Sequence, residues 1–292
     1  MKIAIYGKIL TENYFDFANQ LFEILLAKNI SFIVDEKFYE FLKPHLNFNK
    51  SVATFTCHQD LKEIDYLLSI GGDGTLLETV TLIRDSEIPV LGINTGRLGF
   101  LATVTTENIN LTIDALVNKN YQIDTRSLLS LETEGAIFGQ DNYALNEITL
   151  QKKDTSSMIT INAYIDGEYL NSYWADGLII STPTGSTAYS LSCNGPIILP
   201  RSGNIIINPI APHNLNVRPL VVPDDSELVF KVEGRTENFL IAMDSRSRSV
   251  PLCSELRVKK AAHSFNLIRL KQYDFLNTLR SKLMWGMDKR NY

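Results

Sequence analysis

Over the first hundred residues, short apolar runs alternate with longer runs in which apolar residues recur every three or four positions. The short runs have the length of buried strands, and the longer ones have the spacing of helices that pack on one side. We expect helices at residues 11–29, with Thr11 as N-cap, at 36–43 and at 74–85, and strands in "KIAIYG", "SFIVD", "VATFT", "DYLLSI" and "IPVLGIN". Strands and helices in turn are typical of a parallel sheet with helices on its faces.

The pattern changes near residue 101. A helix is expected at residues 106–120, followed by short β-rich runs bounded by Gly, Asn, Asp and Pro, the spacing of a layered β domain. Residues 274–286 read as a last helix, ended by Gly286, whose apolar stripe needs a partner. We therefore expect a Rossmann-like α/β domain at 1–104 plus about 268–292, and an all-β domain at 105–267.

Composition excludes several classes of protein. The chain has 292 residues, of which 45% are hydrophobic, as in globular proteins, and its net charge of −5 argues against a nucleic-acid or membrane-surface partner. The three cysteines are distant and odd in number, and the four histidines lack metal-ligand spacing, so we expect reduced thiols and no protein metal site. No apolar run could span a membrane, and the N-terminal run is too short for a secretory signal, so a cytoplasmic location is expected.

The segment Gly71-Gly72-Asp73-Gly74-Thr75 joins an expected strand to an expected helix. Backbone N–H groups at such a helix start favour phosphate. The segment matches neither the Walker pattern nor the dinucleotide fingerprint. Asp73 is the unusual element, since a carboxylate repels phosphate. It is either a general base for a phosphoryl acceptor or a helix cap.

Two further segments carry polar side chains next to expected strands. Asn146 and Glu147 in "LNEI" could hold ribose hydroxyls or a metal, or they could mark an edge or a bulge. The run "STPTGSTAYSLS", residues 181–192, places many hydroxyls after a buried strand, with Tyr189 as a stacking surface for a base. It is either the polar wall of a ligand site or an ordinary Ser/Thr loop.

Five stretches follow one another along the chain: "GGDGTLL", "GINTGRLGFL", "LNEI", "DGLIISTPTGSTAYSLS" and "IAPHNLNVRPLVV". In this order they resemble the NAD kinase family over about residues 66–222. The resemblance implies phosphoryl transfer from ATP, with a divalent metal (Mg or Mn), to the 2′-hydroxyl of the adenosine ribose of NAD. It also implies a homo-oligomer, a dimer or homotetramer, built through the β-rich domain. The site residues that it implies are Asp73 as the base; Gly71, Gly72, Gly74 and Thr75 at the phosphates; Phe100 at the adenine; Asn146 and Glu147 at ribose hydroxyls; Asp176 at the nicotinamide; and Thr184, Thr187, Ala188, Tyr189, Ser190, Leu191 and Ser192 around the nucleotide.

Two positions depart from the family pattern. Glu78 stands where many members carry Arg, and Arg246 follows Asp244 where the family often reads Asp-Gly-Gln. We expect Arg246 to supply positive charge near the dinucleotide and so to offset Glu78. Two other functions stay open: a lipid or sugar kinase of the same type, and a non-catalytic NAD(P) sensor. The polar 181–192 wall disfavours a lipid, and a sensor would not need Asp73.

Overall fold

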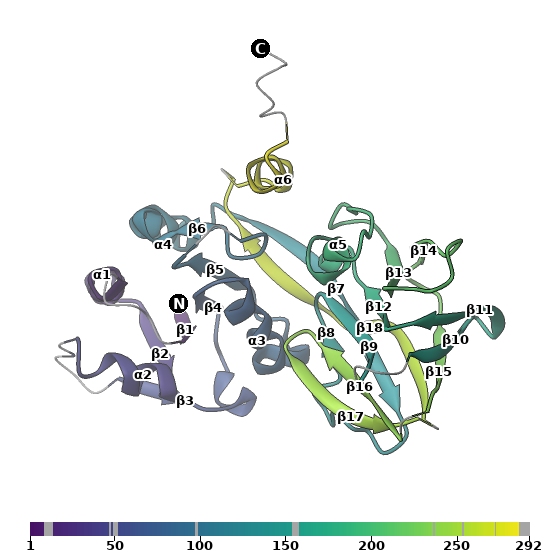
Figure 1. Ribbon diagram of the computed structural model, residues 1–292. Coiled ribbons are helices and arrows are strands. Elements are labelled where there is room, and N and C mark those ends of the chain that lie inside the picture. The colour runs from purple at the N-terminus through teal and green to yellow at the C-terminus, as the bar shows by residue number, and fades with distance from the viewer. Residues whose placement is uncertain are drawn as a thin grey trace, which may run out of the picture. The chain divides into compact units, whose positions relative to one another are not determined.

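The structure is a computed structural model that describes residues 1–8, 14–46, 48, 52–96, 99–153, 158–235, 237–252, 254–271 and 273–285. The chain forms two compact units, Met1–Thr125 with Asn266–Tyr292, and Arg126–Phe265. Strands β7 (Gln122–Thr133) and β18 (Glu255–Arg269) each run from one unit into the other (Figure 1). The boundary expected between residues 104 and 105 precedes the division at 125, because residues 104–117 pack in the first unit's core.

The first unit is built on a parallel sheet in the strand order β3-β2-β1-β4-β5. The end of β18 lies beside β5, with Leu267 opposite Val90, and the short β6 also pairs with β5. The strands of this sheet are β1 (Lys2–Gly7), β2 (Ser31–Asp35), β3 (Ala53–Phe55), β4 (Tyr66–Ile70), β5 (Val90–Asn94) and β6 (Val104–Thr105).

Helices cover both faces of this sheet because its strands are apolar on both sides. Strand β4 shows the alternation: Leu68 and Ile70 join the core cluster that also takes in α1 and α4, while Leu67 points the other way. Helix α3 contacts β4 and β5 on that opposite side. The helices are α1 (Phe15–Ala27), α2 (Glu36–Leu42), α3 (Asp73–Ile83), α4 (Ile109–Val117) and α6 (Phe275–Leu283).

The second unit consists mainly of antiparallel strands in two sheets, and the segment between Ser181 and Asn204 carries a short helix, α5 (Tyr189–Ser192). One sheet has the order β11-β10-β15-β18, with β7 also pairing with β18, and the other has the order β14-β13-β12-β9-β16-β17. The strands not yet given are β8 (Tyr143–Ala144), β9 (Glu147–Lys152), β10 (Ile159–Ile165), β11 (Glu168–Ala175), β12 (Gly177–Ser181), β13 (Asn204–Ile210), β14 (Leu220–Pro223), β15 (Leu228–Glu233), β16 (Asn238–Met243) and β17 (Arg246–Pro251).

Alternate residues of these strands form a single core. Ile148 and Leu150 of β9 pack in one cluster with Phe230 of β15 and Phe239 of β16, whereas the intervening side chains point away. The predicted α/β domain, all-β domain and C-terminal helix are thus confirmed. The cap Thr11 and the stop Gly286 lie outside the described residues.

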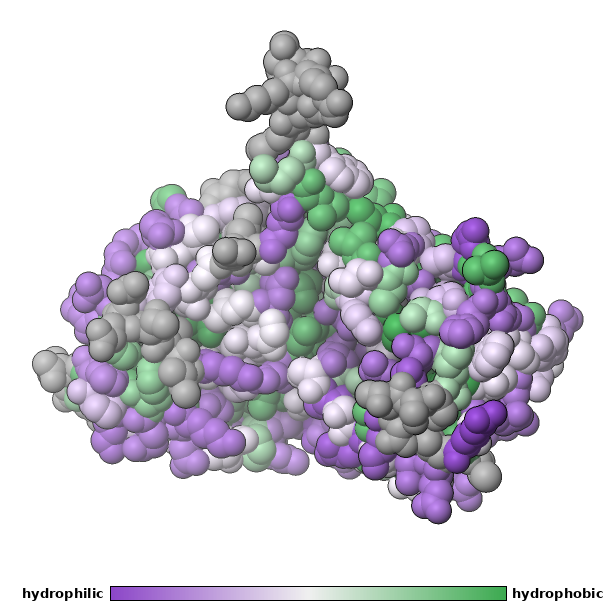
Figure 2. Space-filling model, viewed as in Figure 1, coloured by the Kyte–Doolittle hydropathy of each residue, from purple (hydrophilic) through white to green (hydrophobic). Residues whose placement is uncertain are grey.

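The surface follows the same pattern of buried and exposed positions. Figure 2 shows mostly hydrophilic residues over α2 and β3, whose apolar side chains, such as Phe38 and Phe55, are buried. Among the described residues, no helix has both the length and the apolar character needed to cross a membrane.

Candidate active site

A tight turn between β4 and α3 places Asp73 at the first residue of the helix. Gly71 has φ +150°, and a Cβ there would lie 2.3 Å from the Oγ1 of Thr75, so this position requires glycine. The Gly71 N–H donates to the carbonyl of Ile93 at 2.9 Å, which ties the turn to the end of β5. Gly72 is the N-cap residue of α3.

The Asp73 carboxylate is held by the loop that follows β5. The N–H of Phe100 donates to Oδ2 at 2.7 Å, and the N–H groups of Leu101 and Ala102 donate to Oδ1 at 3.1 and 2.9 Å. A Cβ at Gly99 would lie only 1.8 Å from Oδ1, so the backbone approaches the carboxylate as closely as it can. The side chain therefore fixes a neighbouring loop, and these three bonds do not cap its own helix.

The start of α3 has the features of an anion site. Gly72 and Gly74 are exposed, and Asp73 is half-buried between them. The N–H of Thr75 donates to the carbonyl of Gly72 at 3.0 Å. The N–H groups that precede it at the start of the helix have no acceptor within the helix. Thr75 itself is buried, and its side chain packs against the turn at Gly71.

Phe100 packs against the C-terminal helix, a contact that the sequence did not predict. Its ring centroid lies 6.2 Å from that of Phe275, and the Lys282 ammonium lies 5.4 Å from the Phe100 ring. The hydroxyl of Tyr273, just before α6, accepts from Asn108 at 3.0 Å. Helix α6 therefore packs on the loop whose N–H groups hold Asp73.

In the second unit, Asp244 organises the backbone around Asn146 and Glu147. Its carboxylate accepts from the N–H groups of Leu145, Asn146 and Glu147 at 2.9, 2.8 and 3.2 Å. Asp244 has φ +50° at the turn between β16 and β17, which points it at the start of β9. Asn146 is buried beside this carboxylate.

Glu147 lies in a site that disfavours its charge. Burial raises the pKa of the Glu147 carboxyl to about 8, and the nearby Asp244 carboxylate adds to that shift. Its Oε2 is buried and has no hydrogen-bond partner in the described part of the chain. At neutral pH the group is largely protonated, and it can therefore donate a hydrogen bond as well as accept one.

The hydroxyl-rich segment packs directly on the same backbone. Thr182 donates through its N–H to the Asn146 carbonyl at 2.9 Å and through its hydroxyl to the Leu145 carbonyl at 2.6 Å. A Cβ at Gly185 would lie 2.2 Å from the Asn146 oxygen. The structure thus brings residues 145–147 and 182–186 together, as one site would require.

Two of the expected nucleotide-site residues in this segment are buried. The Thr184 hydroxyl accepts from Arg126 at 3.1 Å, and the Ser190 hydroxyl accepts from Asn208 at 3.1 Å. These two hydroxyls stabilise the loop. The residues of the segment that solvent reaches are Thr187, Ala188, Tyr189, Leu191 and Ser192.

Asp176 ends the turn between β11 and β12 and forms an ion pair. Its Oδ1 lies 2.6 Å from the Nζ of Lys152, and its carbonyl accepts from the Lys152 N–H at 2.9 Å. Both side chains are partly exposed, so the pair is accessible to a ligand.

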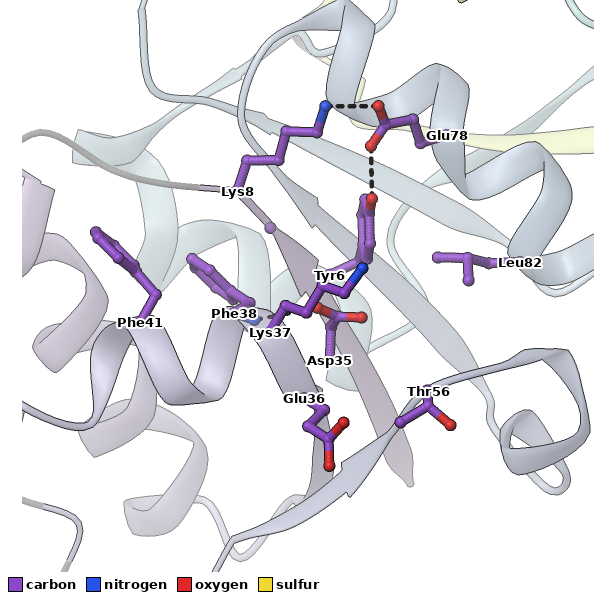
Figure 3. A pocket seen from close by; sticks show the side chains of 11 residues that line it. Tyr6, Lys8, Asp35, Glu36, Lys37, Phe38, Phe41, Thr56, Glu78 and Leu82 are labelled. Carbon is purple, nitrogen blue, oxygen red and sulfur yellow. Dashed lines mark hydrogen bonds and ion pairs between the residues drawn. The ribbon is translucent and has the colours of Figure 1, made fainter. Parts of the chain in front are cut away.

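Glu78 and Arg246 are both engaged within their own units. The Glu78 carboxylate accepts from the Tyr6 hydroxyl at 2.6 Å and from the Lys8 ammonium at 2.5 Å (Figure 3). Burial, followed by the Glu78 carboxylate, raises the pKa of Tyr6. Arg246 donates to the carbonyls of Asp141 and Tyr143, so the backbone engages the charge that was expected to offset Glu78.

Among the residues that the structure describes, no three His, Cys, Asp or Glu side chains form a group that could hold a metal. Mg²⁺ in phosphoryl-transfer sites is commonly held by one or two carboxylates together with substrate phosphates. The residues present therefore fit an ion that arrives with a phosphorylated substrate better than a fixed protein site.

Comparisons with known proteins cover both units. A family model described as the ATP-NAD kinase N-terminal domain matches residues 3–121, and one described as the ATP-NAD kinase C-terminal domain matches residues 145–270. An NAD kinase of Cytophaga hutchinsonii is 49% identical over 292 residues, and one of Flavobacterium psychrophilum is 50% identical over 294 residues; each alignment covers 100% of both chains.

Solved structures share the fold. Yeast NADH kinase in complex with NADH matches with a TM-score of 0.88 and 24% identity, over 99% of this chain and 89% of its own. An NAD kinase from Archaeoglobus fulgidus in complex with ATP matches with a TM-score of 0.75 and 25% identity, over 97% of this chain and 99% of its own.

Proposed function

Because the chain belongs to the NAD kinase family, we propose that it transfers the terminal phosphoryl group of ATP to the 2′-hydroxyl of the adenosine ribose of NAD. The products are NADP and ADP. The reaction is supported by a sequence identity of about half, over the full chain, to named NAD kinases. The residue-level mechanism is supported by the geometry of Asp73.

Asp73 acts as the general base for the 2′-hydroxyl. Three backbone N–H groups fix its rotamer, so the carboxylate needs no reorganisation when substrate arrives. An ionised carboxylate has about four acceptor sites, and Oδ2 accepts one of the three bonds. Oδ2 thus retains capacity for a hydroxyl proton, whereas Oδ1 already accepts two.

The substrate groups follow from the chemistry of each cluster. The turn at Gly71 lets the exposed Gly72 and Gly74 present their helix-start N–H groups to phosphates, with Thr75 packed behind the turn. Phosphoryl transfer depends mainly on such positioning and on charge stabilisation. A divalent ion would supply charge neutralisation on the phosphates, which would also hold it.

The second unit contributes groups for the dinucleotide. Asn146 and a protonated Glu147 offer both hydrogen-bond donors and acceptors to ribose hydroxyls. The buried Glu147 Oε2 has no hydrogen-bond partner in the described part of the chain, and a ribose hydroxyl would supply one. Tyr189 and its exposed neighbours, Thr187, Ala188, Leu191 and Ser192, line the nucleotide, supported from behind by Thr184 and Ser190. Asp176 meets the nicotinamide end, and Phe100 lines the adenine side.

Replacement of Asp73 tests this function. Asp73→Asn keeps the shape and the oxygen that accepts from Leu101 and Ala102, but its NH2 group can neither act as a base nor accept from the Phe100 N–H, so kcat should fall by about two to four orders of magnitude. The protein is incubated with ATP, Mg²⁺ and NAD, and NADP is measured through a coupled dehydrogenase. Asp85→Asn, an exposed acid in the short 3₁₀ turn that follows the same helix, is the control.

Each outcome has a distinct meaning. Near-normal turnover of Asp73→Asn would refute the general base and leave the carboxylate as a holder of the 99–102 loop. Tight NADP binding with no turnover by the wild-type protein would favour a sensor over a kinase. The cytoplasmic location and the homo-oligomeric state stay predictions.

A further inference from the structure

Asn208 is a buried polar residue within an apolar strand. The side chains of β13 from Ile205 to Ile210 are all buried, and Ile205 and Ile207 belong to the core of the second unit. Asn208 faces away from that core, because side chains alternate along a strand. It is 0% exposed, although Asn is disfavoured in strands and burial of an amide costs free energy. An apolar side chain would fit the strand at lower cost, so the amide calls for a physical reason.

The amide of Asn208 holds one residue of α5. Its Nδ2 donates to the carbonyl of Ser190 at 2.9 Å and to the Ser190 hydroxyl at 3.1 Å. Its Oδ1 is buried and has no hydrogen-bond partner among the residues that the structure describes. A buried acceptor without a partner is costly, so the two bonds to Ser190 are the gain that the amide brings.

Gly195 packs against the same pair of residues. Its N–H donates to the Ser190 carbonyl at 2.8 Å. A Cβ at this position would lie 2.2 Å from the Ser190 Oγ and 2.7 Å from the Asn208 Nδ2, so the close approach requires glycine. Ser190 is therefore held by both β13 and the turn that follows α5.

Helix α5 depends on such contacts because it is too short to be stable by itself. It has four residues, whereas isolated helices shorter than about 12–15 residues are marginal in water. Its N-cap residue, Ala188, makes no side-chain capping bond. Tertiary hydrogen bonds must therefore fix the position of α5, and those of Asn208 come from the middle of a sheet.

The position of α5 determines the shape of the proposed dinucleotide site. Solvent reaches its other three residues, Tyr189, Leu191 and Ser192. The helix also lies beside Glu147: burial and the Asp244 carboxylate raise the pKa of Glu147, and the N–H of Tyr189 lowers it. A shift of α5 would therefore change both the exposed wall and the surroundings of Glu147.

We propose that Asn208 is a positioning residue for the dinucleotide, which fixes α5 through Ser190 so that Tyr189 and its neighbours are in place before NAD binds. This inference rests on the proposed function, because it takes α5 as part of the NAD site. Affinity falls in proportion to the fraction of molecules whose site is already formed. Asn208 thus acts on the affinity for NAD and not on the reacting groups.

Three variants and one control test this role. Asn208→Leu removes the amide at a similar side-chain volume, and Ser190→Ala removes only the hydroxyl acceptor. The double variant shows whether the two residues act as one unit. Asn204→Leu is the matched control, since it makes the same change on the same face of β13, four residues and about 13 Å from Asn208.

NAD binding is measured by calorimetry at a temperature where each variant is folded, together with kcat and the KM for NAD and for ATP. We expect Asn208→Leu to raise the Kd and the KM for NAD about tenfold, on the scale of one or two lost hydrogen bonds. Its kcat and its KM for ATP should stay within about twofold of wild type.

The other proteins separate positioning from general loosening. Ser190→Ala should raise the Kd for NAD about threefold, and the double variant should lose no more than Asn208→Leu alone. The Tm of Asn208→Leu should stay within a few degrees of wild type, because leucine also removes the unpaired Oδ1. Asn204→Leu should bind NAD as the wild type does.

A Kd for NAD within about twofold of wild type in folded Asn208→Leu overturns the inference. An equal rise in the KM for NAD and for ATP also overturns it, as does a double variant whose losses multiply. If Asn208→Leu does not fold, Ser190→Ala decides: a raised Kd supports the inference and an unchanged Kd overturns it.

The test distinguishes this inference from the proposed function. If the wild type binds NAD but makes no NADP, and Asn208→Leu weakens that binding, the kinase function fails and the positioning role stands. If the wild type turns over normally and the variants bind NAD unchanged, the kinase function stands and the positioning role fails.

Discussion

Gly99→Ala is the sharpest test of how Asp73 is positioned. The added Cβ would lie 1.8 Å from Asp73 Oδ1, 2.5 Å from its Cγ and 2.7 Å from its Oδ2, whereas ordinary contacts begin at 3.4 Å. The carboxylate or the loop must therefore move by about 3.4 − 1.8 = 1.6 Å. The backbone of Gly99 lies outside the left-handed region, so the effect is steric.

The size of the effect follows from the bonds that this shift strains. The three N–H groups of residues 100–102 hold the carboxylate at 2.7 to 3.1 Å, and a movement of more than about 1 Å cannot preserve all three. A displacement of about 1 Å in a reacting group can cost about a hundredfold in rate. We expect kcat to fall about a hundredfold, with the KM for NAD within a few fold of wild type.

The assay is steady-state NADP formation at saturating ATP and NAD, with the thermal midpoint as a check on folding. Gly96→Ala is the matched control in the same loop, because a Cβ there meets nothing closer than 3.8 Å. If Gly99→Ala keeps a kcat within about twofold of wild type at an unchanged midpoint, then the position of the carboxylate does not limit the reaction.

Two further predictions concern the second unit. The pKa of Glu147 is raised from 4.5 to about 8 in the folded state, so its contribution to stability is lost as pH rises through about 8. Between about pH 6 and about pH 9 the wild-type Tm should therefore fall more than the Tm of Glu147→Gln. Parallel curves of Tm against pH for the two proteins would contradict the shift. Arg246→Ala should lower Tm by several degrees, since it leaves the carbonyls of Asp141 and Tyr143 without the guanidinium. The control Arg248→Ala, at an exposed site on the same strand, should change Tm less. A raised KM for NAD with an unchanged Tm would restore a ligand-binding role to Arg246.

Much of the fold could be predicted from the sequence because each unit has one dominant hydrophobic pattern. The parallel strands of the first unit are continuous apolar runs, and most strands of the second are bounded by turn residues. Strand β11 has no such signal, since Glu168–Ala175 mixes polar and aromatic residues and is ordered as a strand by its pairing with β10. Long-range pairing of this kind has no local signature.

The site was only partly predictable. The motif identified Asp73, but the partners that fix it are N–H groups some 27 to 29 residues away, and backbone donors look alike in every sequence. The hydroxyls of Thr184 and Ser190 were expected to face a ligand, yet they are buried. Composition shows how many hydroxyls a loop has, and only packing decides which of them point inward.

The split of the first unit across the chain has a consequence for synthesis. Its last segment, Asn266–Tyr292, leaves the ribosome about 141 residues after Thr125, which is roughly 7 to 28 s of translation at about 5–20 residues per second. Phe100 has no Phe275 to cover it until the whole of Arg126–Phe265 has emerged. The nascent chain therefore completes the synthesis of its later-encoded β unit before that of its earlier-encoded α/β unit, and the N-terminal portion must wait for Asn266–Tyr292 before its own unit can close.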